Sequence, residues 1–97
     1  MPIVISLVKP PSAYMWAVDM NSERDEILRQ VAMLLRERRE KLRISMNEVA
    51  ARAGLSHTMV LRVEKCQRKP TVETLLRMAK ALDIDPARLL SRAIKRA

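Results

Sequence analysis

The sequence predicts an all-α fold, and two observations support this prediction. Apolar residues recur three and four positions apart over most of the chain after residue 21, which is the spacing of one helical face. Residues that cap helices stand before these segments, and a glycine or a proline stands near several of their boundaries. A bundle of amphipathic helices around one core is therefore expected.

The composition limits the chain to one domain and favours an anionic partner. A chain of 97 residues buries one modest core, and this core must be aliphatic because aromatic residues are 2% of the chain and phenylalanine is absent. Nineteen Lys and Arg against eleven Asp and Glu give a net charge of +8, to which residues 1–21 contribute only Lys9 and Asp19. Such a balance is typical of proteins that bind a polyanion.

Cysteine content and hydropathy indicate the compartment. The single cysteine, Cys66, forbids an internal disulfide and suits the reducing cytoplasm, so a cytoplasmic location is predicted. The apolar run of residues 3–8 is too short for a signal peptide or a membrane span. No membrane partner is expected.

Residues 1–21 are predicted to form an irregular N-terminal tail, and residues 22–97 the helical domain. Pro2, Pro10 and Pro11 remove amide donors and oppose a helix. The run of residues 3–8 could form a strand, but only against a partner such as the same strand of a second subunit. The alternative is a disordered tail, and a translation start at Met20 would leave it without a function.

The first helix is expected to begin at a cap among Asp19, Asn21 and Ser22 and to run for about twenty residues. Its apolar stripe consists of Ile27, Val31, Leu34, Leu35 and Leu42. The opposite side carries charges that can pair four positions apart, namely Arg36 with Glu40 and Glu37 with Lys41. These pairs indicate a solvated face, and phosphate contact is the alternative for Arg38 and Arg43.

Residues 45–70 predict two short helices joined by a tight turn. Ser45 and Glu48 have the spacing of a capping box, in which serine and glutamate each satisfy a backbone amide. This helix ends at Gly54, the only glycine, which can enter a left-handed turn without a Cβ penalty. Ser56 then caps a helix from about residue 57 to 65, and a small residue, Ala50, stands where the two helices cross.

Two more helices are expected before the C-terminus. Thr71 caps a fourth helix that ends near Asp83, and Asp85 caps a fifth whose first position is Pro86, where a missing amide is harmless. The residues expected to face inward in the fourth helix are Leu75, Leu76, Ala79 and Leu82. The fifth carries Leu89, Leu90, Ala93 and Ile94.

The residue inventory argues against an enzyme. One histidine, one cysteine and no Gly-rich phosphate loop leave no nucleophile-base pair and no metal set, since His57 and Cys66 supply two ligands at most. No cofactor is expected.

The motifs of residues 34–90 resemble the helix-turn-helix domain of the Cro and phage-repressor family, also called XRE-type. The matching pattern is Ser45-x-x-Glu48-Val49-Ala50-x-x-Ala53-Gly54-Leu55-Ser56, then Val60-x-x-Val63-Glu64, then Pro70-Thr71-x-x-Thr74-Leu75-x-x-x-Ala79-x-Ala81-Leu82. The resemblance implies a five-helix, lambda-repressor-like domain that binds double-stranded DNA, with the helix at residues 57–65 in the major groove.

The resemblance also implies roles for individual residues. His57, Thr58 and Arg62 occupy the family's base-reading positions, and Arg62 can bond bidentately to O6 and N7 of guanine. The positions implied to lie at the DNA backbone are Arg43, Met46, Asn47, Ser56, Leu61, Lys65, Arg68 and Lys69. Met46 and Leu61 are apolar where the family usually has polar residues.

Other positions are implied to be structural. Arg39 and Glu64 match family positions that form a partly buried ion pair between the first helix and the recognition helix. Ala50 and Gly54 are implied to be structural positions of the helix-turn-helix, at the helix crossing and at the turn. Cys66 stands where the family usually has glycine, so it is either a tolerated substitution or a redox-sensitive thiol.

The resemblance favours a homodimeric repressor-type regulator, because one recognition helix reads only a few base pairs. Within this class the chain could be a stand-alone regulator, an antitoxin that represses its own operon or a controller of a restriction-modification locus. A protein-interaction module is the alternative from another class, with Met46, Met59 and Leu61 forming an apolar patch for a partner such as a toxin.

Overall fold

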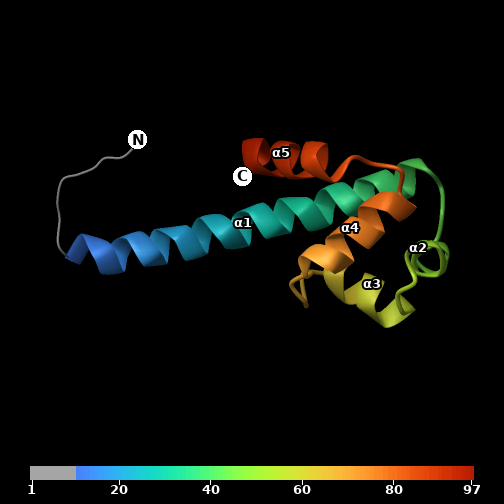
Figure 1. The fold of residues 1–97 in the computed structure, drawn as a ribbon, viewed down its shortest axis with the longest axis horizontal. Helices are drawn as coiled ribbons and strands as arrows, with labels where there is room; N and C mark the ends of the chain where they lie inside the picture. Colours follow the sequence, from blue (N-terminus) through green and yellow to red (C-terminus); the bar gives the residue numbers. More distant parts are fainter. Residues whose placement is uncertain (1–10) are drawn as a thin grey trace.

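Five helices make up the described fold. The computed structural model describes the backbone of residues 11–97 and the side chains of residues 22–97. The helices are α1 (Pro11–Lys41), α2 (Met46–Ala53), α3 (His57–Glu64), α4 (Val72–Ala81) and α5 (Pro86–Arg96). Figure 1 shows α1 as a long rod, with the other four helices gathered around its C-terminal half. The described part contains no strand, so the all-α prediction is confirmed.

The first helix begins earlier than the sequence suggested. An irregular backbone was predicted through residue 21, whereas α1 starts at Pro11. At the first position of a helix, proline loses no hydrogen bond and its fixed φ suits the helix. Pro11 therefore prevents the helix from extending further toward the N-terminus but does not prevent it from starting there. The strand predicted for residues 3–8 lies outside the described residues.

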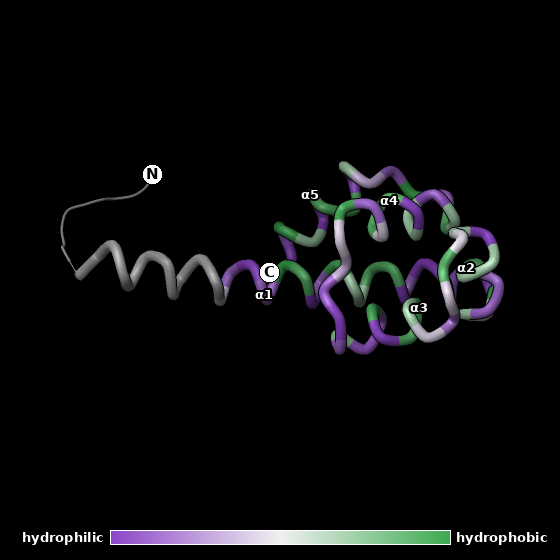
Figure 2. Tube along the Cα trace, turned by 60° about the horizontal axis from the view of Figure 1, so that its bottom comes forward, coloured by the Kyte–Doolittle hydropathy of each residue, from purple (hydrophilic) through white to green (hydrophobic). Residues whose placement is uncertain are grey.

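The core is aliphatic, as predicted. Its fully buried side chains come from all five helices and from the residue that follows α4, and the largest are Val31, Leu35, Val49, Val60, Val63, Met78, Leu82 and Leu89. Figure 2 shows hydrophobic and hydrophilic residues alternating along each of these helices, as amphipathic packing requires. Leu42, which lies beyond the end of α1, and Leu76 were expected to face inward and are exposed instead. Two of the apolar residues expected on the fifth helix, Leu90 and Ile94, are exposed as well.

Four of the five helices end in the same way, although the chain has one glycine. A residue with positive φ follows each of them: Arg43 (59°), Gly54 (69°), Cys66 (59°) and Asp83 (55°). The next amide then donates to the carbonyl five residues earlier: Ile44 to Arg39, Leu55 to Ala50, Gln67 to Arg62 and Ile84 to Ala79. This is the Schellman pattern, which satisfies carbonyls that a helix leaves unpaired. Only the example at Gly54 was predicted.

Charged residues of α1 hold the C-terminal helices in place. Arg38 donates to the carbonyls of Leu82 (2.9 Å) and Asp83 (3.1 Å), so its guanidinium closes the end of α4. The phosphate contact considered for Arg38 stays a prediction. Glu37 pairs with Arg96 of α5 at 3.1 Å rather than with Lys41.

The contact between Glu37 and Arg96 makes one part of the stability pH-dependent. The hydrogen bond from the Arg96 guanidinium lowers the pKa of Glu37 below its ordinary value. Because the folded pKa is the lower one, the contact stabilises the fold above the unfolded pKa, and this contribution is lost as the pH falls through the folded pKa.

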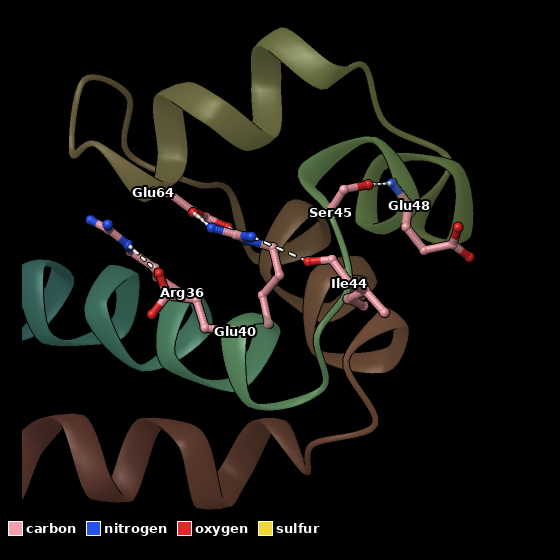
Figure 3. A network of polar contacts seen from close by, with 7 residues as sticks. Arg36, Glu40, Ile44, Ser45, Glu48 and Glu64 are labelled. Carbon is pink, nitrogen blue, oxygen red and sulfur yellow. Dashed lines mark hydrogen bonds and ion pairs between the residues drawn. The ribbon is translucent and has the colours of Figure 1, made fainter.

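An ion pair between Arg39 and Glu64 joins α1 to α3 (Figure 3). Arg39 Nε lies 2.7 Å from Glu64 Oε2, and its Nη2 lies 3.1 Å from Oε1. The two side chains are 12% and 3% exposed. Arg39 Nη1 also donates to the carbonyl of Ile44 at 3.2 Å, so one guanidinium ties α1, α3 and the turn before α2 together. The hydrogen bond to Glu64 raises the pKa of Arg39.

The replacement Glu64→Gln should lower the free energy of unfolding by an amount on the order of 3 kcal/mol or less, because it leaves the Arg39 guanidinium underpaired. Urea unfolding measures the change. Exchanging the charges, with Arg39→Glu and Glu64→Arg in one chain, should recover part of the loss of the two single reversals. Strictly additive losses would mean that the pair has no coupling.

The replacement Cys66→Gly should raise the free energy of unfolding by up to about 1 kcal/mol, because the left-handed position then carries no Cβ. Cys66→Ala is the matched control, since it removes the exposed thiol and keeps the Cβ. Thermal unfolding of both variants in reducing buffer measures the difference. Equal melting temperatures would show that the positive φ at residue 66 costs nothing.

Candidate nucleic-acid interface

Caps and a left-handed residue set the geometry of α2 and α3. Ser45 Oγ accepts the amide of Glu48 at 3.1 Å, and Ser56 Oγ accepts the amide of Met59 at 3.0 Å. Only half of the predicted capping box forms, because the Glu48 carboxylate points away from Ser45 (Figure 3). It pairs with Arg52 instead, at 3.0 Å. Serine capping alone therefore starts both helices.

The turn between α2 and α3 is held by Arg77 of α4. Its Nη1 donates to the carbonyl of Ala53 at 3.2 Å, and Glu73 fixes the guanidinium with contacts of 3.1 and 2.9 Å. A Cβ on Gly54 would lie 3.0 Å from Arg77 Nη1, so glycine satisfies both the positive φ and the close approach of this side chain. In the sequence, Glu73 and Arg77 are four positions apart, which is the spacing of an ion pair within one helix. Nothing in this spacing indicates the contact of Arg77 with α2.

The recognition helix α3 has one buried and one open face. Val60, Val63 and Glu64 are buried against the bundle. The outward residues His57, Thr58, Arg62 and Lys65 are exposed, and Leu61 is half-buried beside them. All three predicted base-reading side chains thus lie on the solvent side of α3, two of them in its first turn.

The residues predicted to lie at the DNA backbone flank this face. They differ in their exposure and in whether their side chains already have partners within the fold. Asn47 at the start of α2, Arg43 before it and Arg68 after α3 are exposed. Met46 packs against the core, and the Ser56 hydroxyl is used as a cap. Lys69 Nζ lies 3.3 Å from an Asp25 carboxylate oxygen on α1.

Several cations at this surface have no acidic neighbour. Among residues 22–97, Arg43, Arg62, Lys65 and Arg68 have no carboxylate within ion-pair distance. Their charge is available to an anionic ligand, whereas that of Lys69 is partly compensated by Asp25. The open face of α3 therefore combines hydrogen-bonding side chains with uncompensated positive charge.

The described residues contain few other kinds of site. No three His, Cys, Asp or Glu side chains among them lie close enough together to hold a metal ion. None of the described helices is long and apolar enough to cross a membrane.

Comparison with known proteins identifies the fold and the family. The helix-turn-helix family profile matches residues 35–89. Two solved restriction-modification controller proteins are similar in structure: a mutant of C.Esp1396I (TM-score 0.67, 20% identity, covering 72% of this chain and 91% of that one) and C.AhdI from Aeromonas hydrophila (TM-score 0.61, 35% identity, covering 64% and 94%).

Sequence relatives have the same domain within longer chains. Two uncharacterized HTH-type transcriptional regulators of Mycobacterium tuberculosis, from strains CDC 1551 / Oshkosh and ATCC 25618 / H37Rv, are each 37% identical over 59 residues. The match covers 61% of this chain and 42% of each relative, so the chain spans less than half the length of these proteins. The profile covers more than half of the chain, from the last part of α1 through α2, α3 and α4 to the start of α5. The chain therefore belongs to the XRE-type helix-turn-helix family.

Proposed function

We propose that this protein is a sequence-specific double-stranded DNA-binding regulator of the repressor type that inserts α3 into the major groove. The observation that carries the proposal is the open face of α3, where three side chains able to read bases are exposed on a helix whose opposite face is buried. The family membership and the regulators among its relatives support it. In this proposal the protein binds DNA in the cytoplasm and catalyses no reaction.

Base reading falls to the N-terminal two turns of α3. His57 and Thr58 lie in the first turn, where a recognition helix meets base edges. Arg62 lies one turn further, and its fork can donate to O6 and N7 of guanine. Thr58 offers a hydroxyl for hydrogen bonding and a methyl group for contact with thymine.

Backbone contacts would hold the helix in register. Arg43 and Asn47 flank the start of α2, the helix that abuts the DNA backbone in this class, and Lys65 and Arg68 flank the end of α3. Met46 packs against the core and the Ser56 hydroxyl caps α3, so neither side chain is available for a hydrogen bond to phosphate. In this proposal these two positions contact the DNA backbone only by packing and through backbone amides at the starts of α2 and α3. Leu61 and Lys69 are the remaining residues proposed to lie at the DNA backbone.

Two copies of the chain would bind one operator. An α3 of eight residues reads only a few base pairs, and proteins of this class place two recognition helices on half-sites about 34 Å apart. Control of a restriction-modification locus is a candidate setting, because two structural relatives are controller proteins of such systems. The genes adjacent to this one test that setting.

The replacement Arg62→Ala should weaken binding to a selected operator by roughly 1 to 3 kcal/mol and relax base preference at one position per half-site. Arg68→Ala is the matched control, because the same truncation at a loop position should weaken all sequences alike and lower the salt slope by about one unit. Arg68 serves better here than Lys69, whose truncation would also release Asp25.

Binding of both variants to operator and scrambled duplexes, measured at several salt concentrations, separates the two roles. Equal losses on operator and scrambled DNA for Arg62→Ala would contradict its base-reading role. In that case a protein-interaction module on the same fold would become the better interpretation.

A further inference from the structure

Cations without an acidic neighbour also lie away from the recognition helix. Within residues 22–97, no carboxylate lies within ion-pair distance of Lys41 on α1 or of three residues on α5, namely Arg88, Arg92 and Lys95. All four side chains are exposed. We call Arg88, Arg92 and Lys95 the α5 stripe. The proposed function gives the stripe and Lys41 no role.

The α5 stripe lies on one side of its helix. Its residues are four and three positions apart, which is the spacing of side chains that share a helical face. At about 1.5 Å per residue, the stripe is about 10 Å long. The phosphates of one DNA strand recur about every 3.4 Å along the duplex axis, so this length of backbone holds about three phosphates. The stripe therefore has the length and the charge to follow a DNA strand.

The stripe borders a groove of about 420 Å³ between α1 and α5. Arg88 and Arg92 line this groove from α5, and Arg38 and Lys41 line it from α1. Carbonyls at the end of α4 hold the Arg38 guanidinium, which has no carboxylate partner among the described side chains. The groove therefore adds cations of the first helix to those of the stripe.

Acidic residues line the groove as well, but they leave the stripe positive. Asp83 and Asp85 lie in the turn between α4 and α5, and the stripe runs away from this turn. Glu37 is neutralised by Arg96 at 3.1 Å. The hydrogen bond from Arg96 and, after it, the charges of Arg96 and Arg92 lower the pKa of Glu37, so the positive field of the stripe reaches α1.

A duplex bound at α3 cannot also reach the stripe. Figures 1 and 3 both show α1 lying between α5 and α3. The Cα trace extends 22 and 18 Å along its two shorter axes, and a single duplex would have to turn around this body. Even strongly wrapped DNA bends by only about 45° per 10 base pairs, which is about 34 Å of duplex. An anion at the stripe is therefore a separate segment of DNA or another molecule.

The apolar residues of α5 argue against a membrane as this anion. A helix that binds a membrane surface does so in proportion to the apolar area that it inserts. On α5, Leu89 and Ala93 are fully buried in the protein core, so only Leu90 and Ile94 are exposed. The helix thus offers its cations in full but little of its apolar face.

We propose that the α5 stripe and Lys41 bind the phosphate backbone of a second DNA duplex while α3 holds the operator, so that the protein bridges two DNA segments. Contacts between cations and phosphates carry no sequence information, so this second contact is independent of sequence. It weakens steeply with salt and is lost at moderate salt, where operator binding by α3 persists.

This inference rests on the proposed function, because α3 must hold the first duplex. The two can fail separately, since capture of the protein by immobilised operator is measured before retention of the second duplex. Equal capture by immobilised operator and immobilised scrambled DNA would contradict only the proposed function.

The test saturates an immobilised operator duplex with the full chain and then adds a fluorescent scrambled duplex at several salt concentrations. The double variant carries Arg88→Gln and Arg92→Gln, because glutamine removes the charge and keeps the helix propensity. The matched control carries Arg24→Gln and Lys80→Gln, which remove the same charge at exposed positions that do not line the groove between α1 and α5. Circular dichroism verifies that both variants are folded.

The wild-type chain should retain the scrambled duplex at about 50 mM salt. For the double variant, the slope of log K against log salt for this retention should fall by about two units, one for each lost cation. The control variant should keep the wild-type slope. The immobilised operator should capture all three proteins equally, because none of the replacements lies on α3.

A wild-type chain that retains no second duplex at about 50 mM salt would overturn the inference. Equal losses in the double variant and the control would also overturn it, since net charge alone would then explain the retention. Weaker capture of the double variant by the operator would overturn it too, because the stripe would then belong to the operator surface. Retention of phosphatidylglycerol vesicles in place of the duplex would assign the stripe to a membrane instead.

Discussion

The contact between Arg39 and Glu64 fixes how the recognition helix sits on the long first helix. Both side chains are almost fully withdrawn from water, and the two short hydrogen bonds between them define both distance and angle. A buried ion pair adds little net stability over an apolar pair, but the loss of either partner leaves an uncompensated buried charge. Because Val60 and Val63 pack on the same side, the ion pair and the core together leave one face of α3 open.

Arginine side chains perform a related task at two other junctions. Arg38 closes the end of α4, and Arg77 closes the end of α2 beside Gly54. Each guanidinium binds carbonyls that a helix end leaves unpaired, which also suits the negative end of the helix dipole. The net charge of +8 therefore overstates the charge available to DNA, because part of it holds the fold together.

The sequence predicted best where the signal was local. Ser45, Gly54, Ser56 and Thr71 marked helix boundaries that the structure reproduces, because a cap depends only on its own neighbours. The start of α1 was missed because a proline at the first helical position looks the same in sequence as one that breaks a helix.

Long-range polar contacts were the harder part. The pairing of Arg39 with Glu64 came from the family resemblance, while the contacts of Arg77 with Ala53 and of Lys69 with Asp25 had no sequence signal. The left-handed conformations of Arg43, Cys66 and Asp83 were missed for a different reason, because none of these residues is glycine. For the candidate site residues on α3, helical spacing predicted which side chains are exposed. Whether a cation has a carboxylate nearby could not be predicted in this way, because that carboxylate can be distant in sequence, as Asp25 is from Lys69.

The central claim is that the open face of α3 meets DNA, and amide chemical shifts measured during titration with a duplex test it most directly. The account predicts that shifts concentrate at Ser56, Thr58 and Arg62 and at the start of α2, and that they persist at moderate salt. Shifts spread evenly over every basic surface, or centred on α5 and the C-terminal part of α1, would contradict it.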